Sequence, residues 1–352
     1  RWLFERIFPF EAKLTGEHCY WATLLGAMEL IKSGAVSFSD MYFYIEDIVR
    51  ATKESGLKAN ISHGTSGMEE GTRFKDLKAF TDTDRLNNLL RQENHDRIKI
   101  DVGLHAEYTS NQSLVEEVAD YAKSKDLIVQ VHLSETKKEH EECKQRFGMT
   151  PTQYFEKCGL LEQPIVAAHC VWIEGEDFDI LQNKGATVAH CISSNLKLGS
   201  GFAPVKKMID KGVKVSIGTD GASSNNNLNM LEEVNLAAMA NKGINQDPEF
   251  MNTKQILELA TYNGAMAQGR KDCGKIKVGN RADIVVYDLD KPHLQPIHDV
   301  LSNILFSAQA SDICFSMIDG TVVYKDGHLT QIDGERVIYE VNRINKRILG
   351  QL

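Results

Sequence analysis

Three short apolar runs decide the fold: Ile165-Val-Ala-Ala-His169, Ala186-Thr-Val-Ala-His190 and Val213-Lys-Val-Ser-Ile-Gly-Thr219. Each run reads as a buried strand, and a stretch long enough for a helix separates it from the next. Pro204 and Gly212 bracket one of these helices, at its start and just past its end. Strands that alternate with helices in this way are typical of a parallel sheet wrapped by helices.

The same alternation extends towards the N-terminus, where Gly34 stands at the expected end of one helix and Ser113 with Glu116 predicts a capping box that opens another. Seven βα units are one short of a closed eight-stranded barrel, and a seven-stranded version would leave a sheet edge exposed. We therefore predict an α/β fold, a (β/α)8 TIM-type barrel lacking its first strand in this chain, with the missing unit preceding Arg1. The four additional strands are expected at Ala35–Met41, Leu57–Ser62, Ile98–His105 and Leu127–Leu133.

The last quarter of the chain has a different pattern. From Cys273 onward, glycines punctuate short runs such as Ile284–Tyr287 and Thr321–Tyr324, and a helical pattern begins at about Gly334. We predict two domains: residues 1–270 form the barrel with βα units 2–8, and residues 271–352 form a small β-sandwich appendage with a C-terminal helix.

Composition narrows the class of protein. The chain has 352 residues, 42% of them hydrophobic, so it can bury one barrel-sized core. A net charge of −9 argues against nucleic-acid or membrane partners and favours a small-molecule substrate. Seven scattered cysteines without a C-x-x-C pair indicate a reducing, cytoplasmic location, and no apolar run reaches the ~18 residues that span a bilayer. Homo-oligomer formation is left open.

Polar residues recur where the predicted strands end, which is the catalytic face of a barrel. Singly, a histidine at a strand end or an aspartate after Gly-Thr is more often structural than catalytic. Their joint placement favours chemistry, because neutral imidazoles and a carboxylate bind a divalent metal that activates water. His132 and Asp220 suit the ligand roles, and Glu135 is placed to move protons beside them. The full set is His105, His132, Glu135, His169, His190 and Asp220.

Four segments resemble the amidohydrolase superfamily, and more closely its branch of methylthioadenosine/S-adenosylhomocysteine deaminases and chlorohydrolases. The likeness extends from Phe8-Pro-Phe-Glu11 to Gly279-Asn-Arg-Ala-Asp283. The segments are Val131-His-Leu-Ser-Glu-Thr136, Ala167-Ala-His-Cys-Val171, Ser194-Asn-Leu-Lys-Leu-Gly199 and Gly218-Thr-Asp-Gly-Ala-Ser-Ser-Asn-Asn226.

The resemblance implies one divalent metal, zinc or iron with zinc favoured, held by an H-x-H pair on strand one, a histidine on strand five and an aspartate on strand eight. The last two match His132 and Asp220. By the same match, Glu135 is the proton shuttle and also contacts substrate, and His169 hydrogen-bonds the attacking hydroxide. The implied substrate contacts are Glu11 on the ribose hydroxyls, His105, and Arg85 at the distal end of the substrate.

The chain departs from the family pattern at four places. It contains no H-x-H, and we expect that pair upstream of Arg1. Gly103-Leu-His105 replaces a Gly-Pro-His, Cys191-Ile192 replaces an Asn-Pro, and Ser62-His63 stands where nucleoside deaminases have an arginine. We expect these three changes to line the substrate pocket.

The predicted activity is metal-dependent hydrolytic deamination of 5′-methylthioadenosine, S-adenosylhomocysteine or 5′-deoxyadenosine to the inosine analogue and ammonia. One alternative is a guanine-type deaminase or triazine-type chlorohydrolase on the same scaffold. A second is a catalytically inactive barrel that serves as a binding protein, which would leave Glu135, His169 and Asp220 without a purpose.

Overall fold

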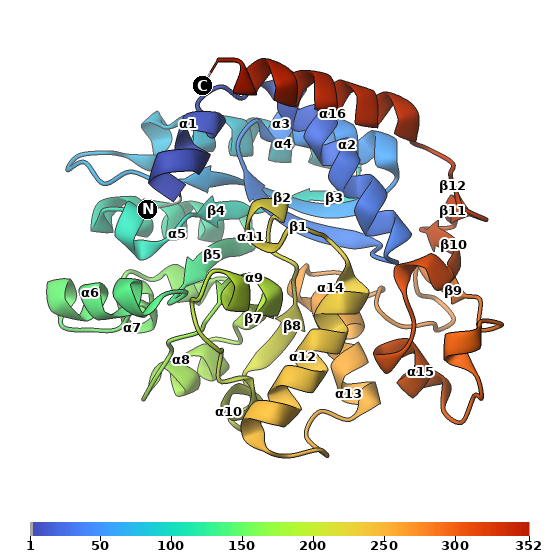
Figure 1. Ribbon diagram of the computed structural model, residues 1–352. Helices are drawn as coiled ribbons and strands as arrows, with labels where there is room; N and C mark the ends of the chain where they lie inside the picture. The colour runs from blue at the N-terminus through green and yellow to red at the C-terminus, as the bar shows by residue number, and fades with distance from the viewer. Residues whose placement is uncertain (1–2, 352) are drawn as a thin grey trace.

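A computed structural model describes residues 3–351 of the chain (Figure 1). Its large sheet follows the order β1-β2-β4-β5-β6-β7-β8, with β3 paired to β2, and every neighbouring pair is parallel. Within the described residues no ladder joins β8 to β1, so the sheet is an open barrel, as predicted. The strands are β1 (Ser37–Tyr42), β2 (Lys58–Thr65), β3 (Ile98–Ile100), β4 (Val102–Leu104), β5 (Val129–Leu133), β6 (Ile165–His169), β7 (Thr187–His190) and β8 (Lys214–Ile217).

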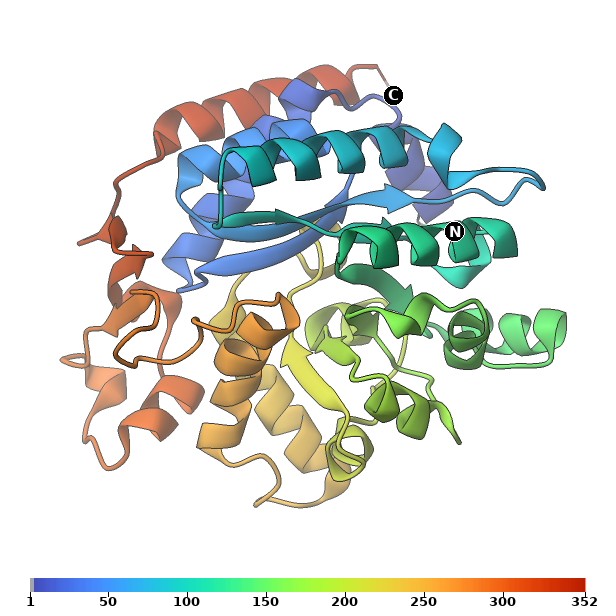
Figure 2. The ribbon, with the colours of Figure 1, turned by 180° about the vertical axis from the view of Figure 1, so that it is seen from behind.

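Helices surround the strands on the outside (Figures 1 and 2). None of those described is long and apolar enough to cross a membrane. The helices of the barrel are α1 (Phe8–Glu11), α2 (Gly16–Lys32), α3 (Ile45–Ser55), α4 (Lys78–Gln92), α5 (Gln112–Lys125), α6 (Lys137–Phe147), α7 (Pro151–Lys157), α8 (Asp177–Asn183), α9 (Ile192–Lys197), α10 (Val205–Asp210), α11 (Ala222–Asn225), α12 (Met230–Asn245), α13 (Thr253–Glu258) and α14 (Gly264–Ala267).

One predicted helix start is wrong. The capping box assigned to Ser113 and Glu116 does not form, because α5 begins two residues earlier and its N-cap is Asn111. The Asn111 side chain accepts a hydrogen bond from the Leu114 amide at 2.8 Å. Asparagine caps a helix as well as serine does, so the S-x-x-E pattern had a competitor in the adjoining sequence.

Alternation along the strands places the core. Val102, Val129 and Val131 are fully or almost fully buried in the layer between strands and helices. Successive side chains point to opposite faces of a strand, so His132 points into the barrel. The parallel ladders then bring the C-terminal ends of β4 to β8 to one end of the barrel, where the predicted site residues lie.

The appendage is a small antiparallel sheet with the order β12-β11-β10-β9, and α16 runs from it along α2 (Figure 1). A buried ion pair ties it to the barrel: Lys58 Nζ lies 2.5 Å from Asp283 Oδ2. One apolar cluster includes residues from both sides of the predicted boundary at residue 270, and that boundary stays a prediction. The elements are β9 (Ile284–Tyr287), α15 (Val300–Phe306), β10 (Ile313–Ile318), β11 (Thr321–Lys325), β12 (His328–Leu329) and α16 (Gly334–Leu349).

Candidate active site

His132, near the end of β5, is held in one orientation. Its Nδ1 lies 2.7 Å from the carbonyl oxygen of His105, and a carbonyl only accepts, so Nδ1 carries the proton and donates. Nε2 therefore presents a lone pair. Burial, together with the neighbouring His169, lowers the pKa of His132, which favours the neutral imidazole. Neutral imidazole with one nitrogen fixed by a carbonyl is the form that binds metals.

The turn after β5 places Glu135. Ser134 adopts a left-handed backbone with φ of 47°, and buried Glu139 of α6 accepts hydrogen bonds from the amides of Ser134 and Glu135, both at 2.8 Å. Thr136 completes a capping box with Glu139. Burial raises the pKa of Glu139 to about 8, while the backbone donors act in the opposite direction. The Glu135 carboxylate itself accepts from Ser200 Oγ at 3.2 Å.

His105 lies beside His132, with ring centroids 5.0 Å apart. Its Nδ1 is 3.0 Å from Thr109 Oγ1, whose own proton goes to the carbonyl of Ala106. Thr109 therefore accepts, and His105 also carries its proton on Nδ1. Burial and the nearby His132 lower the pKa of His105 to about 4, so its ring is neutral at neutral pH.

His169 stacks on His132, with centroids 5.6 Å apart and an interplanar angle of 22°. The β5–β6 ladder pairs His169 with Leu133, so a regular strand would turn its ring towards the helices. Instead His169 has a left-handed φ of 73°, which reorients the side chain at the strand end. Its Nδ1 lies 2.8 Å from Asn195 Oδ1.

Asp220 follows β8 and also has a left-handed backbone, with φ of 60°. Ser194 Oγ donates to its Oδ2 at 2.6 Å, and the Gly221 amide donates to its Oδ1 at 2.6 Å. The adjacent residues Ser194 and Asn195 contact Asp220 and His169, and His169 stacks on His132. His132 and Asp220 therefore lie at the same end of the barrel, although they are 88 positions apart in the sequence.

The donor set fits part of a metal site. His132 offers a free Nε2 and Asp220 an oriented carboxylate, and these are the types of ligand that zinc takes. Among residues 3–351, no group of three or more His, Cys, Asp or Glu side chains is arranged to hold a metal ion. The assignment of His132 and Asp220 as metal ligands stays a prediction.

The predicted substrate contacts divide into two groups. Glu11 lies near the C-terminal end of β1, where its Oε1 accepts a hydrogen bond from Tyr42 OH at 2.8 Å. Arg85 is not brought to the site: its guanidinium forms an exposed ion pair with Glu46 of α3, at 2.6 Å. Arg85 lies on the outer face of α4, so the prediction that it contacts the substrate is not supported by its position.

Sequence reasoning missed the residues that hold these groups. Ser194, Asn195 and Ser200 each contact one predicted catalytic side chain, and Tyr42 contacts Glu11. For Ser194 and Asn195 the sequence offered one indication, since both lie in the segment 194–199, which resembles the family. That segment contains no residue with an obvious chemical role.

His190 lies behind the site rather than in it. It pairs in register with Ile217, and its ring stands edge-on to Phe202 at 6.2 Å. The side chain is 1% exposed, and neither ring nitrogen has a hydrogen-bond partner among the described residues. Burial and the nearby His169 lower the pKa of His190 to about 4.

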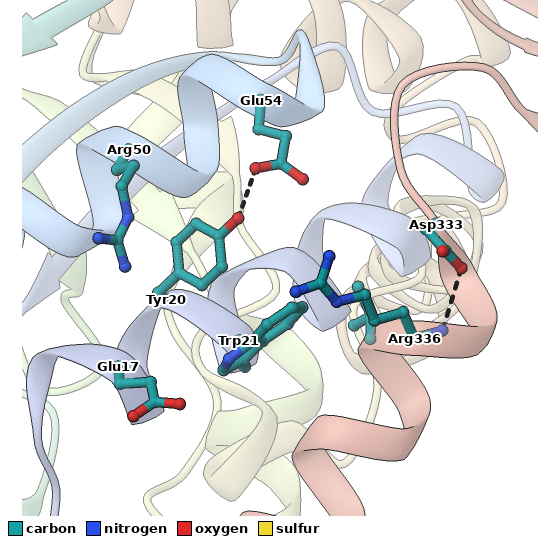
Figure 3. A pocket seen from close by; sticks show the side chains of 8 residues that line it. Glu17, Tyr20, Trp21, Arg50, Glu54, Asp333 and Arg336 are labelled. Atoms are coloured by element: carbon teal, nitrogen blue, oxygen red, sulfur yellow. Dashed lines mark hydrogen bonds between the residues drawn. The ribbon is translucent and has the colours of Figure 1, made fainter.

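A cavity of about 400 Å³ lies elsewhere, between α2, α3 and α16 (Figure 3). Tyr20 and Trp21 of α2 line it, with Arg50 over the first ring and Arg336 over the second. Tyr20 OH donates to Glu54, and the dashed line in Figure 3 marks this bond. None of the predicted site residues lines this cavity, so we take the strand ends as the active site.

Comparison with known proteins places the chain in a family. Residues 1–323 match the family described as "Amidohydrolase family". A 5-methylthioadenosine/S-adenosylhomocysteine deaminase of Caldanaerobacter subterraneus subsp. tengcongensis is 41% identical over 353 residues, which cover 100% of this chain and 81% of the relative. A 5′-deoxyadenosine deaminase of Methanothermobacter thermautotrophicus is 39% identical over 338 residues, covering 96% and 78%. The chain belongs to the amidohydrolase family, and the predicted resemblance is confirmed.

Solved structures agree on the fold. An adenosine deaminase from Xanthomonas campestris with bound zinc superposes with a TM-score of 0.94 at 28% identity, covering 99% of this chain and 80% of that one. An atrazine chlorohydrolase from Arthrobacter aurescens in complex with zinc gives 0.85 at 22% identity, over 95% and 78%, and shows the fold alone. The family, together with the zinc bound in the adenosine deaminase structure, supports a divalent metal as cofactor.

Proposed function

We propose that this chain is the catalytic part of a hydrolase that deaminates an adenosine-type nucleoside, such as 5′-methylthioadenosine, S-adenosylhomocysteine or 5′-deoxyadenosine, to the inosine analogue and ammonia. One observation carries the proposal: His132, His169, Glu135 and Asp220 meet at the C-terminal end of the barrel. The relatives at 39–42% identity carry the names of deaminases acting on these nucleosides. A small molecule is therefore the substrate, and the free state of all seven cysteines accords with a cytoplasmic location.

His132 and Asp220 would hold the metal, which we propose to be zinc. When bound, a zinc ion lowers the pKa of a coordinated water towards ~7 and so supplies a nucleophile at neutral pH. The His132 ring is fixed through Nδ1 and can offer only Nε2. Asp220 keeps its orientation through Ser194 and the amide of Gly221.

The remaining side chains handle protons and orientation. Glu135 would protonate N1 of the purine, take up the proton of the C6 hydroxyl as the carbonyl forms, and pass it to the departing amine, so that one carboxyl group serves as acid twice. Asp220 would accept the other proton of the attacking water, and this proton returns to Glu135 after ammonia leaves. His169 hydrogen-bonds that water and the tetrahedral C6 centre.

Selection of a nucleoside over a free base falls to Glu11. Its carboxylate is held by Tyr42 and would accept the ribose hydroxyls. A base that lacks the sugar leaves that carboxylate without its ribose partners, at a cost of ~1–3 kcal/mol. His105 presents Nε2 beside His132 and would contact the purine.

A substrate panel tests the proposal. The zinc-loaded enzyme is given methylthioadenosine, S-adenosylhomocysteine, 5′-deoxyadenosine, adenine, guanine and a chlorotriazine, and release of ammonia or chloride is measured. We expect a nucleoside to have the highest kcat/KM. Preferred turnover of guanine or the triazine would refute the nucleoside assignment and leave a hydrolase, whereas no turnover of any compound would favour the inactive binding protein.

A further inference from the structure

One segment of the chain, Ser194–Ser200, touches three separate groups of the proposed active site. It comprises the last four residues of α9 and the loop that follows, and the proposed function gives Asn195 no role. Its contacts join residues from the ends of three different strands. They are Ser194 Oγ to Asp220 Oδ2 at 2.6 Å, Asn195 Oδ1 to His169 Nδ1 at 2.8 Å, and Ser200 Oγ to Glu135 Oε1 at 3.2 Å.

Asn195 is almost completely buried. It is 1% exposed, and its amide nitrogen has no hydrogen-bond partner among the described residues. The helix that carries it is anchored by buried Glu233, which accepts from the Ser193 amide at 3.3 Å and from Asn225 Nδ2 at 2.7 Å. Asn195 therefore meets His169 from a fixed backbone.

The amide oxygen of Asn195 decides where His169 carries its proton. An amide oxygen only accepts, so a contact of 2.8 Å to Nδ1 requires an Nδ1–H that donates. His105 and His132 are held in the same form, by a hydroxyl and a carbonyl oxygen. Three imidazoles of one site thus share a tautomer, and each is fixed by a different acceptor.

We propose that Asn195 is a positioning residue that holds His169 as the Nδ1–H tautomer, so that His169 meets the attacking water through an Nε2 lone pair, as a hydrogen-bond acceptor. The tautomer is inferred from the contact between Asn195 Oδ1 and His169 Nδ1, and the role towards water rests on the proposed function. A neutral His169 in the other tautomer would donate through Nε2 and could not accept from water. Asn195 thereby selects which of the two hydrogen-bonding roles His169 plays when the reaction begins.

Imidazole 15N NMR reads the tautomer directly. The zinc-loaded, full-length protein is labelled with 15N-histidine and measured at about pH 8, where an ordinary imidazole is neutral. The His169 signals are assigned by their loss in His169→Gln. Asn195→Leu removes the acceptor, and Asn195→Asp keeps an oxygen in the same place. Ser200→Ala is the matched control, since it belongs to the same segment but contacts Glu135.

We expect a protonated Nδ1 and an unprotonated Nε2 at His169 in the unsubstituted protein, in Asn195→Asp and in Ser200→Ala. Asn195→Leu should shift the signals to the Nε2–H form and lower kcat by about 10–100-fold, the usual size for an outer-shell partner. An Nε2–H tautomer in the unsubstituted protein, or an unchanged spectrum in Asn195→Leu, overturns the proposal. If the leucine variant does not fold, the other spectra decide.

The two proposals fail separately. If the panel shows no nucleoside turnover but His169 has its proton on Nδ1, the substrate assignment is wrong and the role of Asn195 in fixing the tautomer stands. If nucleosides are deaminated and His169 has its proton on Nε2, the function stands and the role of Asn195 is refuted.

Discussion

Replacing His190 should change how the stability of the protein responds to acid. The ring is 1% exposed, and burial lowers its pKa from 6.5 to about 4. A group whose pKa is lower in the folded state favours folding above its unfolded pKa and loses that contribution as the pH falls. His190 therefore contributes its full effect at neutral pH, and this effect declines between pH 6.5 and about pH 4.

The magnitude follows from the shift. Each pKa unit is worth about 1.36 kcal/mol. Lowering the pH from 6.5 to about 5 therefore reduces the free energy of unfolding by about 2 kcal/mol through the His190 ring alone. His190→Leu cannot take up a proton and should escape that loss. It also replaces two buried nitrogens that have no described partner, so at about pH 7.5 we expect no large loss of stability.

Urea unfolding, followed by circular dichroism at about pH 7.5 and about pH 5, measures the difference. The decrease in the free energy of unfolding between the two pH values should be about 2 kcal/mol smaller in His190→Leu than in the unsubstituted protein. His328→Leu, at an exposed position of β12, is the control and should follow the unsubstituted protein. Equal pH dependence in all three proteins would refute the reasoning that His190 is buried in its neutral form.

Three further predictions concern the site and the appendage. Glu135→Gln should keep the fold and lower kcat by about 10²–10⁴-fold. The control Glu142→Gln, on the exposed face of α6, should leave kcat unchanged. A loss of kcat under about tenfold in Glu135→Gln would remove Glu135 from proton transfer. Asp220→Asn should reduce the divalent metal bound per chain, measured by elemental analysis, and unchanged affinity would contradict its ligand role. Asp283→Ala should lower the free energy of unfolding by about 3–5 kcal/mol, because it leaves buried Lys58 unpaired; a loss below about 1 kcal/mol in equilibrium unfolding would argue against this.

Alternation of strands and helices was enough to predict the barrel, because apolar runs of this length have few other uses in a soluble chain. One strand was predicted too long: Ile98–His105 is divided into β3 and β4 at Asp101. Asp101 is 3% exposed and accepts hydrogen bonds from Asn60 and Gln130. Its partners lie on two other strands, so nothing in the local sequence indicates where the ladder changes.

The site was predictable where strand ends carry chemistry and unpredictable where contacts are long-range. His132 and Asp220 could be placed because each directly follows or ends an apolar run. Asn195 could not, since its partner His169 is 26 residues away and an asparagine inside a short helix is ordinarily read as a surface residue. The position of Arg85 does not support its predicted contact with the substrate, because its guanidinium is paired with Glu46 at the surface.

Two of the departures from the family pattern say less about which substrate the enzyme accepts than the sequence suggested. Leu104 and Ile192, two of the replacements expected to line the pocket, are fully buried in the apolar layer between strands and helices. The neighbouring Gly103 is required, because a Cβ there would meet the carbonyl oxygen of His63 at 2.4 Å. Both replacements are therefore packing changes behind the strands. The alternatives of a guanine-type deaminase or a chlorohydrolase gain no support from these two positions, and the substrate is left to the groups that face the barrel interior.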